Sequence, residues 1–200
     1  MIRIAKTSDA YSVAKIHQRT LTKSFLSNLG LDFLESLYKF LLSKELVIVY
    51  EDANGISGFV SYSSNSSGMM SKFLITCPAC IIKLFGILIT SPGKAQRFIE
   101  TFKAPFKSKT AKSSKGIITL PSAELLSISV DTDCQAKGVG GQLLQALEDY
   151  LKQKGITQYK VIAGVELESA NSFYAKNGFV LVNQIVIHGN SLSNVYVKTL

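Results

Sequence analysis

The stretch "DTDCQAKGVGGQLLQ", residues 131–145, places three glycines within four positions. Glycines at such a point let backbone amides approach an anionic ligand, because no side chains stand in the way. The preceding "AELLSISV", residues 123–130, is apolar and predicts a strand. After the glycines, apolar residues recur at helical spacing: Leu143, Leu144, Leu147, Tyr150 and Leu151. The order strand, glycine loop and amphipathic helix predicts an anion-binding loop.

The pattern of this loop narrows the choice of anion. A P-loop carries Lys-Ser or Lys-Thr after its glycines, and none follows here. A dinucleotide fingerprint requires a third glycine where Leu143 stands. What remains is "QAKGVG", residues 135–140, followed by a helix whose first amides are unpaired. This arrangement predicts binding of a diphosphate without magnesium or a dedicated lysine, and a turn required only for tight packing is the alternative.

Composition and charge limit the class of protein. The chain has 200 residues, of which 46% are hydrophobic, so we expect a single domain over residues 1–200. The net charge of +8 arises in one segment: residues 66–120 contain nine basic residues and one acid, Glu100, whereas the other residues hold 13 of each. This local charge predicts either an anion-facing surface or a solvated loop, and it argues against a general nucleic-acid coat.

Three further features of the sequence, the cysteines, the histidines and the apolar runs, indicate the redox compartment, whether a metal site is expected and whether a helix could span a membrane. Three cysteines do not form a disulfide framework, so we expect a reducing compartment, the cytoplasm, with Cys77 and Cys80 as buried thiols. No metal site is expected, because His17 and His188 lack ligand spacing. The run at residues 77–90 is shorter than the roughly 20 residues that span a bilayer. A helix that lies at a membrane interface is the alternative interpretation of this run.

The remaining periodicity predicts a mixed α/β fold with a central, mostly antiparallel sheet. Strands are expected at residues 2–5, 46–50, 56–63, 123–130, 159–167, 179–187 and 194–200, with a hairpin turn at Asn54-Gly55. Helices are expected around Val13 to His17, from Leu31, after the glycine loop, and over residues 168–178. Residues 66–120 are expected to be an insertion: an apolar helix broken by Pro78, a helix at about 94–103, and a mobile segment at 103–116.

Two motifs together carry a resemblance to a known family. The Q-x-x-G-x-G at residues 135–140 is followed by "ANSFYAKNGF" at residues 170–179, and this pair resembles the GNAT superfamily of N-acetyltransferases. The resemblance is specific over residues 123–180 and looser over residues 1–64. It implies a GNAT-like fold, a twisted sheet flanked by helices, with acetyl-CoA as cosubstrate and no metal. Where family members often carry an asparagine, seven positions before the tyrosine, this chain has Leu167.

The resemblance also implies roles for individual residues. The strand before the loop is expected to splay from its neighbour and bind the pantetheine arm, with the Val130 amide facing the thioester carbonyl. Tyr174 would protonate the leaving thiolate. Of the two candidate bases, Glu124 is preferred to Glu166, while Asp131 and Asp133 are interpreted as turn residues. The implied cofactor-binding residues are Ile128, Ser129, Val130, Gln135, Ala136, Lys137, Gly138, Val139, Gly140, Gly141 and Asn171, the last in place of the missing asparagine.

These features together predict an acetyl-CoA-dependent N-acetyltransferase. It would transfer the acetyl group by direct attack, in a ternary complex, to a primary amine of a small molecule such as an amino sugar or a nucleotide-linked sugar. Peptide or protein amines are the alternative acceptors. An alternative of a different class is a non-catalytic module that binds CoA, or that binds a membrane or nucleic acid through residues 69–115. Peripheral contact of the enzyme with a membrane is a further alternative. Nucleic acid is not the expected partner. The sequence is compatible with a monomer and with a homodimer.

Overall fold

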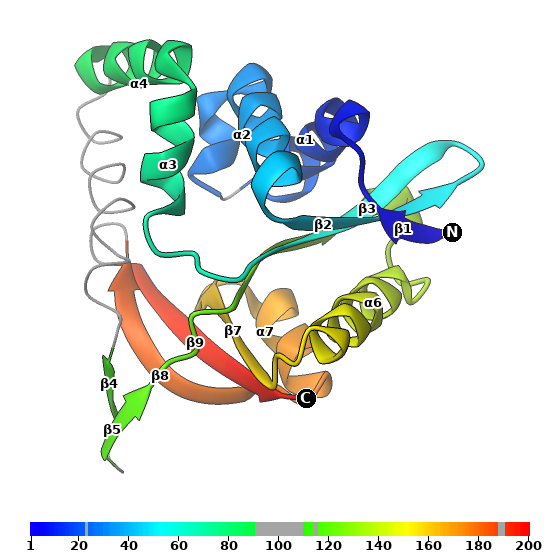
Figure 1. The fold of residues 1–200 in the computed structure, drawn as a ribbon, viewed down its shortest axis with the longest axis vertical. Helices are drawn as coiled ribbons and strands as arrows, with labels where there is room; N and C mark the ends of the chain where they lie inside the picture. Colours follow the sequence, from blue (N-terminus) through cyan, green and yellow to red (C-terminus); the bar gives the residue numbers. More distant parts are fainter. Residues whose placement is uncertain (23, 91–109, 114–115, 188–190) are drawn as a thin grey trace.

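A computed structural model describes residues 1–22, 24–90, 110–113, 116–187 and 191–200 of the chain. The described residues form one seven-stranded sheet in the order β1-β2-β3-β6-β7-β9-β8, together with a separate hairpin, β4-β5 (Figure 1). The strands are β1 (Ile2–Ile4), β2 (Leu46–Asp52), β3 (Gly55–Ser63), β4 (Thr110–Ser113), β5 (Gly116–Thr119), β6 (Glu124–Val130), β7 (Gln158–Gly164), β8 (Val180–Ile187) and β9 (Ser191–Thr199). The helices are α1 (Ala10–Thr20), α2 (Leu31–Lys44), α3 (Met69–Thr76), α4 (Pro78–Thr90), α6 (Val139–Gln153) and α7 (Glu168–Lys176), with 3-10 turns η1 (Thr7–Asp9), η2 (Leu26–Leu29) and η3 (Thr132–Cys134).

The sheet has the mostly antiparallel character that the sequence predicts. Every neighbouring pair is antiparallel except β6 and β7, which run parallel. The predicted hairpin joins β2 to β3, where Gly55 adopts a positive φ of 108° and the Asn54 amide donates to Asp52 Oδ1 at 2.7 Å. The mixed α/β fold class is therefore confirmed.

Side-chain alternation along the strands divides the interior into two cores. On β2, Val47 and Val49 face the core under α1 and α2, whereas Ile48 faces the core under α6. Helices accordingly cover both faces of the sheet in Figure 1. The stripe predicted on the helix after the glycine loop is real, because Leu143 and Leu147 are fully buried against the sheet.

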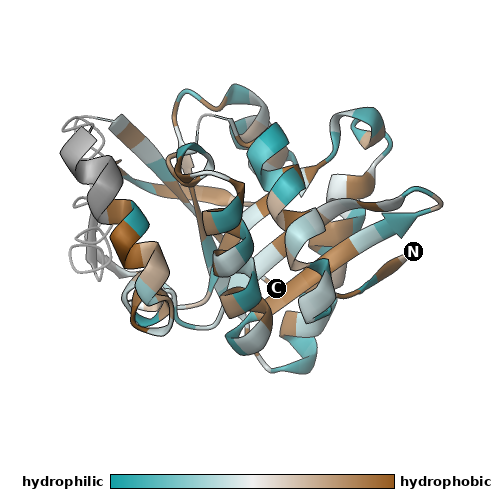
Figure 2. Cartoon of the chain, turned by 90° about the horizontal axis from the view of Figure 1, so that it is seen from above, coloured by the Kyte–Doolittle hydropathy of each residue, from teal (hydrophilic) through white to brown (hydrophobic). Residues whose placement is uncertain are grey.

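The segment at residues 66–120 is only partly as expected. Pro78 does separate two helices, α3 and α4, and the described part of α4 is strongly hydrophobic in Figure 2. The prediction of a mobile segment at residues 103–116 was wrong for residues 110–113, which form β4, because Thr110 to Ser113 pair with β5. The predicted helix at residues 94–103 lies outside the described residues. Among the residues described, no helix combines the length and apolar character needed to cross a membrane.

The prediction of two free, buried thiols was also wrong. Cys77 and Cys80 form a disulfide across the junction of α3 and α4. The α3-α4 turn brings their Cα atoms to 5.3 Å, within the range that a disulfide spans. Cys134, at the end of η3, remains a free thiol.

A buried histidine is the one imidazole in the core of the described residues. His17, on α1, is 2% exposed, and its ring stacks near Phe59 of β3. Burial lowers the pKa of His17 to about 4 from its ordinary value of 6.5, because desolvation disfavours the charged ring. The folded protein therefore holds this ring neutral at pH values where an unfolded chain would protonate it.

This depressed pKa predicts acid sensitivity. Above about pH 6.5 the ring is neutral in both states. As pH falls from 6.5 toward 4, the unfolded chain binds a proton that the folded chain rejects, so up to about 3 kcal/mol of unfolding free energy is lost. Urea unfolding at several pH values measures the slope, and His17→Asn should abolish it over this window. Asp9 loses its stabilising contribution only at lower pH, because Arg3 holds the pKa of its carboxyl below 3.8. An unchanged slope in the variant would contradict the assignment.

Candidate active site

The central feature of the site is a gap within the sheet. β6 and β7 pair only at Glu124 with Lys160 and at Leu125 with Val161. Both strands continue beyond these pairs, and β6 stays paired with β3 on its other side as far as Val130. The strands therefore separate after Leu125, and one edge of β6 is left without a strand neighbour. This is the splay that the resemblance implied.

The backbone of β6 turns alternate groups toward this gap. The Asp131 amide donates to the Ser57 carbonyl of the β3 side at 2.7 Å. Antiparallel alternation then directs the N–H and C=O groups of Ile128 and Val130 away from β3 and into the gap. Between Ser127 and Leu125 the register with β3 shifts, so Leu126 is an extra, bulged residue. Beyond the bulge, the gap is thus lined by peptide groups of Ile128 and Val130 that have no strand partner.

The glycine loop follows directly from this strand end. The Gln135 side chain donates to the Val130 carbonyl at 3.0 Å, so Gln135 shapes the loop. Asp131 accepts from the Asp133 amide and caps η3, as expected of a turn residue. Arg19 at the end of α1 binds Asp131 and Thr132.

Two residues of the loop take left-handed backbone conformations before α6 begins. Ala136 has φ 60° and Gly138 has φ 76°. The Lys137 ammonium donates to the Asp133 carbonyl at 2.9 Å, so this lysine is engaged within the loop. The backbone thereby turns sharply into the helix, and no side chain caps the first turn.

The start of α6 is open where a ligand would lie. A side-chain carbon built at Gly138 or Gly141 would meet nothing within 4 Å, whereas one at Gly140 would lie 3.4 Å from the Phe173 ring. Gly140 thus serves the packing of α6 on α7, and the other two glycines border free space. Val139 is buried and offers only its backbone. Exposed first-turn amides and the helix dipole together suit a diphosphate.

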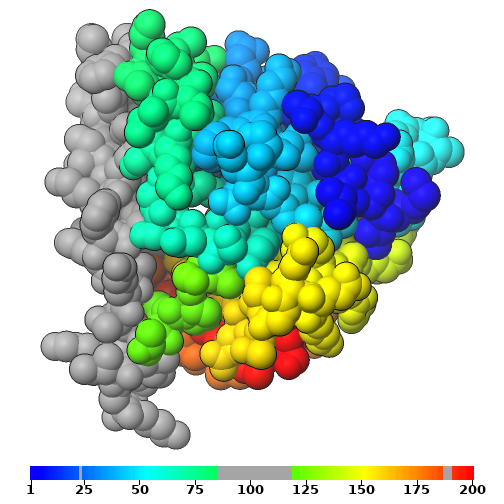
Figure 3. Space-filling model, in the orientation of Figure 1, coloured from blue at the N-terminus to red at the C-terminus, as the bar shows by residue number. Residues whose placement is uncertain are grey.

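A large cleft continues from the β6-β7 gap toward the helices. Its volume is about 1880 Å³, well above the 300–1000 Å³ of a pocket for one drug-sized ligand. In Figure 3 the N-terminal residues, blue to cyan, lie above the C-terminal ones, yellow to red. The cleft lies between these parts, lined by α1, α2, β6, the connection from β3 to α3, β7 and α7. Glu124, Glu166 and Tyr174 all reach it.

Tyr174 is a buried phenol at the wall of this cleft. It lies on α7, is 6% exposed, and packs against Phe179 and Tyr196 with ring centroids 5.3 and 5.9 Å away. Burial raises the pKa of the Tyr174 phenol well above 10, so the hydroxyl is protonated at neutral pH. The structure thus places a neutral donor at this wall.

Asn171 lies one turn before Tyr174 and is engaged within the protein. Its side-chain nitrogen donates to the carbonyls of Gly164 and Leu167 at 2.9 and 2.8 Å. Its oxygen accepts from Asn194 and from the Tyr196 hydroxyl at 2.8 and 2.9 Å. Three of these bonds fasten α7 to β7 and β9, the fourth closes the start of α7 at Leu167, and together they leave this side chain little capacity to bind a ligand.

Glu124 stands at the closed end of the gap with two partners that sequence reasoning missed. Ser66 donates to Glu124 Oε2 at 2.5 Å, and the Lys160 ammonium lies 3.3 Å from the same oxygen. Lys160 is almost fully buried and also donates to the Pro121 carbonyl at 2.6 Å. A lysine inside the apolar strand "YKVIAG" was the available signal. Glu166 is exposed instead, folded back over Gly164.

Metal ligation does not explain this cluster. In the part of the chain that the structure describes, no three His, Cys, Asp or Glu side chains converge to hold a metal ion. The groups at the gap are instead peptide amides, one phenol, two carboxylates and one ammonium. Such groups can donate and accept hydrogen bonds and exchange protons with a ligand.

Comparisons with known proteins bear on the same region. A model of the acetyltransferase (GNAT) domain matches residues 108–181, which include the gap, the glycine loop and Tyr174. None of the curated proteins compared with the chain matches it.

Solved structures resemble the whole chain. The crystal structure of Ard1 from Thermoplasma volcanium has a TM-score of 0.61 at 17% identity, covering 100% of this chain and 97% of the other. An N-acetyltransferase from Staphylococcus aureus Mu50 has a TM-score of 0.62 at 17% identity, with coverage of 100% and 97%. The PaiA N-acetyltransferase from Thermoplasma acidophilum, crystallised with coenzyme A, has a TM-score of 0.54 at 15% identity, with coverage of 100% and 98%.

At these identities the structures show a shared fold, while the domain match rests on the residues around the gap. The strand splay, the glycine loop at the start of α6 and the tyrosine on α7 all lie within the matched residues 108–181. Residues 108–181 therefore match a GNAT acetyltransferase domain, and the chain as a whole shares the fold of these solved acetyltransferase structures.

Proposed function

We propose that this acetyltransferase uses acetyl-CoA to acetylate a primary amine on a small, polyhydroxylated molecule such as an amino sugar. The observation that carries the proposal is the lining of the cleft. Serine is the most frequent lining residue, and four charged side chains reach the cleft in the described part of the chain: Glu124, Lys160, Glu166 and Glu168. Hydroxyl groups donate and accept hydrogen bonds, as a polyol requires. Three carboxylates against one ammonium favour a cationic acceptor.

The charge of the cleft distinguishes between the acceptors considered from sequence. A nucleotide-linked sugar carries phosphates, which three nearby carboxylates would repel. A free amino sugar or a similar amine carries one positive charge, which they attract. Among the described residues of the segment at 66–120, those that reach the cleft are all uncharged: residues 66–71, Thr119 and Leu120. Peptide amines remain the second candidate, because a cleft of this volume also admits an extended chain.

The donor would lie along the open edge of β6. Its diphosphate would contact the amides at the start of α6, beside Gly138 and Gly141. Its pantetheine arm would pair with the peptide groups of Ile128 and Val130, as an added strand would. The Val130 amide, or that of the bulge at Leu126, would face the thioester carbonyl and stabilise the oxyanion. Ser129, Gln135, Ala136 and Lys137 would act by holding these amides in place.

The proton transfers are then assigned to two side chains. We propose that Glu124 receives a proton from the attacking amine at the closed end of the gap, with Lys160 and Ser66 orienting its carboxylate. Tyr174 would donate a hydrogen bond to the sulfur as negative charge develops there. The raised pKa of Tyr174 makes full proton loss costly at this buried wall. The same burial would also raise the pKa of the departing thiol, which would keep the two pKa values close to each other.

The chain would act as a single domain, residues 1–200, with residues 66–120 as an insertion. Strands on both sides of that segment join one sheet, since β3 and β6 pair directly.

The first test is binding followed by turnover. Calorimetry should show binding of CoA, acetyl-CoA and desulfo-CoA, because the diphosphate and pantetheine contacts do not require the sulfur. An assay for released thiol should then show turnover with amino sugars exceeding that with peptides and with nucleotide-linked sugars. Absence of binding to any CoA species would overturn the proposal, and a preference for peptides would overturn the acceptor class.

Two glycines that flank α6 provide a matched pair of variants for testing the diphosphate site. Gly138 before the helix and Gly155 after it have φ values of 76° and 70°, and neither has an atom within 4 Å of an added Cβ. Alanine at either position costs about 1 kcal/mol of stability. Only Gly138→Ala should weaken CoA binding, by roughly tenfold, the value of one charge-assisted hydrogen bond. Equal affinities in both variants would place the diphosphate elsewhere.

Replacement of Tyr174 tests the leaving-group role. Tyr174→Phe should lower kcat by about 100-fold, the lower range of general-acid contributions, while the CoA affinity measured by calorimetry stays within about twofold. The substitution removes one hydroxyl and keeps the ring that packs against Phe179. A variant with unchanged kcat would exclude Tyr174 as the donor.

Two carboxylates of the cleft are compared to test the base. In Glu124→Gln the acidic limb of the pH profile of kcat/KM should disappear, with a rate loss of at least about 100-fold. Glu166→Gln, the control, should retain the limb. Loss of the limb in the control alone would transfer the role to Glu166.

A further inference from the structure

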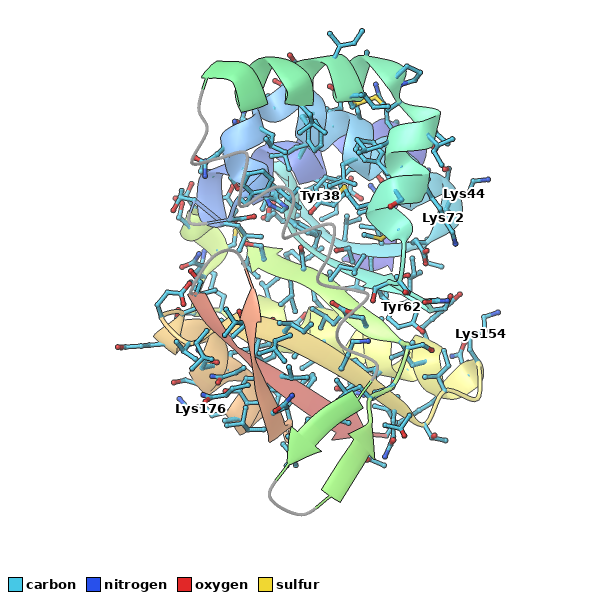
Figure 4. The ribbon with its side chains drawn as sticks, turned by 90° about the vertical axis from the view of Figure 1, so that its left-hand side faces the viewer. Tyr38, Lys44, Tyr62, Lys72, Lys154 and Lys176 are labelled. Atoms are coloured by element: carbon cyan, nitrogen blue, oxygen red, sulfur yellow. A yellow bond between two sulfur atoms is a disulfide. The ribbon has the colours of Figure 1, made fainter. Side chains whose placement is uncertain are left out.

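A buried lysine stands at the closed end of the gap between β6 and β7. Lys160 of β7 is 7% exposed and lines the cleft. Other lysines show the usual placement: in Figure 4 the exposed side chains of Lys44, Lys72, Lys154 and Lys176 extend away from the ribbon. A lysine is almost never buried unless partners replace the water that its ammonium loses. The partners of Lys160 therefore indicate what the ammonium does in the cleft.

The protein satisfies only part of this ammonium. Lys160 Nζ donates a hydrogen bond to the Pro121 carbonyl at 2.6 Å, and it forms an ion pair with Glu124 Oε2 at 3.3 Å. An ammonium carries three N–H donors. Because the described residues supply these two partners, at least one N–H is left for a ligand in the cleft.

Glu124 is arranged in a complementary way. The Ser66 hydroxyl donates to Oε2 at 2.5 Å, and Lys160 pairs with the same oxygen. Among the described residues, none donates a hydrogen bond to the other oxygen, Oε1. The Glu124 side chain is 16% exposed, and it lines the cleft as Lys160 does. A free acceptor oxygen and a free N–H donor thus belong to two side chains that touch at one point of the cleft wall.

This pair favours a ligand whose two polar groups lie close together. An amine donates to the free carboxylate oxygen, and a hydroxyl oxygen accepts from the ammonium. In the gauche form of a 1,2-amino alcohol, the nitrogen and the oxygen lie within hydrogen-bond distance of each other, so one molecule can reach both side chains. An amine whose hydroxyl is several carbons away reaches only one of them. The other side chain is then desolvated without a partner, which is how sites built on hydrogen bonds reject an analogue.

We propose that Lys160 is a specificity-determining residue that donates to the hydroxyl beside the reacting amine, so that the acceptor is a 1,2-amino alcohol such as a 2-amino sugar. This role rests on the proposed acetyl transfer, in which Glu124 receives the proton of the same amine. An α-amino acid would offer a carboxylate to Lys160, but Glu166 and Glu168 also reach the cleft and would repel it. The amine of a peptide N-terminus has a carbonyl oxygen in the corresponding position and is a comparison in the test.

A second pair of lysine and glutamate supplies the matched control. Lys198 of β9 donates to Glu148 of α6, and their side chains are 18% and 7% exposed. Neither residue lines the cleft. Lys160→Met and Lys198→Met therefore remove the same ammonium from the same kind of buried pair, and only the first removes a donor from the cleft.

The acceptor class is tested on the wild type with amines that share one ring. The kcat/KM for thiol release, expressed per concentration of neutral amine, should be at least about tenfold higher for trans-2-aminocyclohexanol than for trans-4-aminocyclohexanol or cyclohexylamine, the value of one charge-assisted hydrogen bond. Ethanolamine should likewise exceed glycinamide, which carries a carbonyl in place of the hydroxyl. Equal values for the two aminocyclohexanols, or a preference for glycinamide, would overturn the assignment to amino alcohols.

The role of Lys160 is tested by the ratio of two rates in each variant. In Lys160→Met the preference for trans-2-aminocyclohexanol over cyclohexylamine should fall about tenfold, whereas Lys198→Met should keep the wild-type preference. Any disturbance of Glu124 cancels in this ratio, because both amines use the same base. A purely structural role of Lys160 would lower both rates together. An unchanged ratio in a folded Lys160→Met, checked by circular dichroism, would therefore overturn the role.

Calorimetry with CoA present gives a readout that needs no turnover. The wild type should bind trans-2-aminocyclohexanol about tenfold more tightly than the 4-isomer. The double variant Lys160→Met with Glu124→Gln, which leaves no unpaired buried charge if the single variant does not fold, should bind the two isomers equally. If the wild type releases no thiol with any amine but shows this preference, and the double variant loses it, the proposed function fails and the role of Lys160 stands. If amines are acetylated but neither rates nor affinities distinguish the isomers, the proposed function stands and the role of Lys160 is overturned.

Discussion

The separation of β6 from β7 after Leu125 is the constraint on which the rest of the site depends. A sheet normally satisfies its peptide groups by pairing, and unpaired ones are costly when buried. Here pairing stops after two residue pairs, and the remaining edge of β6 faces an open cleft. The strand keeps its shape because β3 holds its other edge as far as Val130. A ligand that offers its own amide groups can therefore complete the sheet.

Several polar contacts fasten the elements around the gap, in addition to the apolar packing of the two cores. Thr20 of α1 is hydrogen-bonded to Ser129 at 2.6 Å, and Arg19 holds the start of η3. On the opposite side, Asn171 ties α7 to β7 and β9 through three hydrogen bonds. Directional contacts of this kind specify position and orientation, which apolar packing alone specifies less sharply. The two walls of the gap are thus held at a defined separation.

Local patterns account for the elements that the sequence predicted correctly. Period-2 and period-3.6 apolar repeats are read over a few residues, and they identified the strands, the hairpin at Asn54-Gly55 and the leucine stripe of α6. The errors have a different origin. Whether Cys77 and Cys80 are bonded depends on how α3 turns into α4, and whether residues 110–113 form a strand depends on their pairing with residues 116–119. Neither the disulfide nor the strand can be predicted from the local sequence alone.

The sequence by itself determined the loop, the helix behind it and the tyrosine that follows, because glycine spacing and helical periodicity are local properties of the chain. Tertiary structure alone decided which groups meet: Lys160 and Ser66 at Glu124, and His17 at Tyr38. These residues are separated by long stretches of sequence, and only strand order and helix packing bring them within hydrogen-bond distance. Tertiary structure also turned Asn171 from an expected ligand contact into a structural clamp, since its bonding capacity is taken up by neighbours that folding places around it.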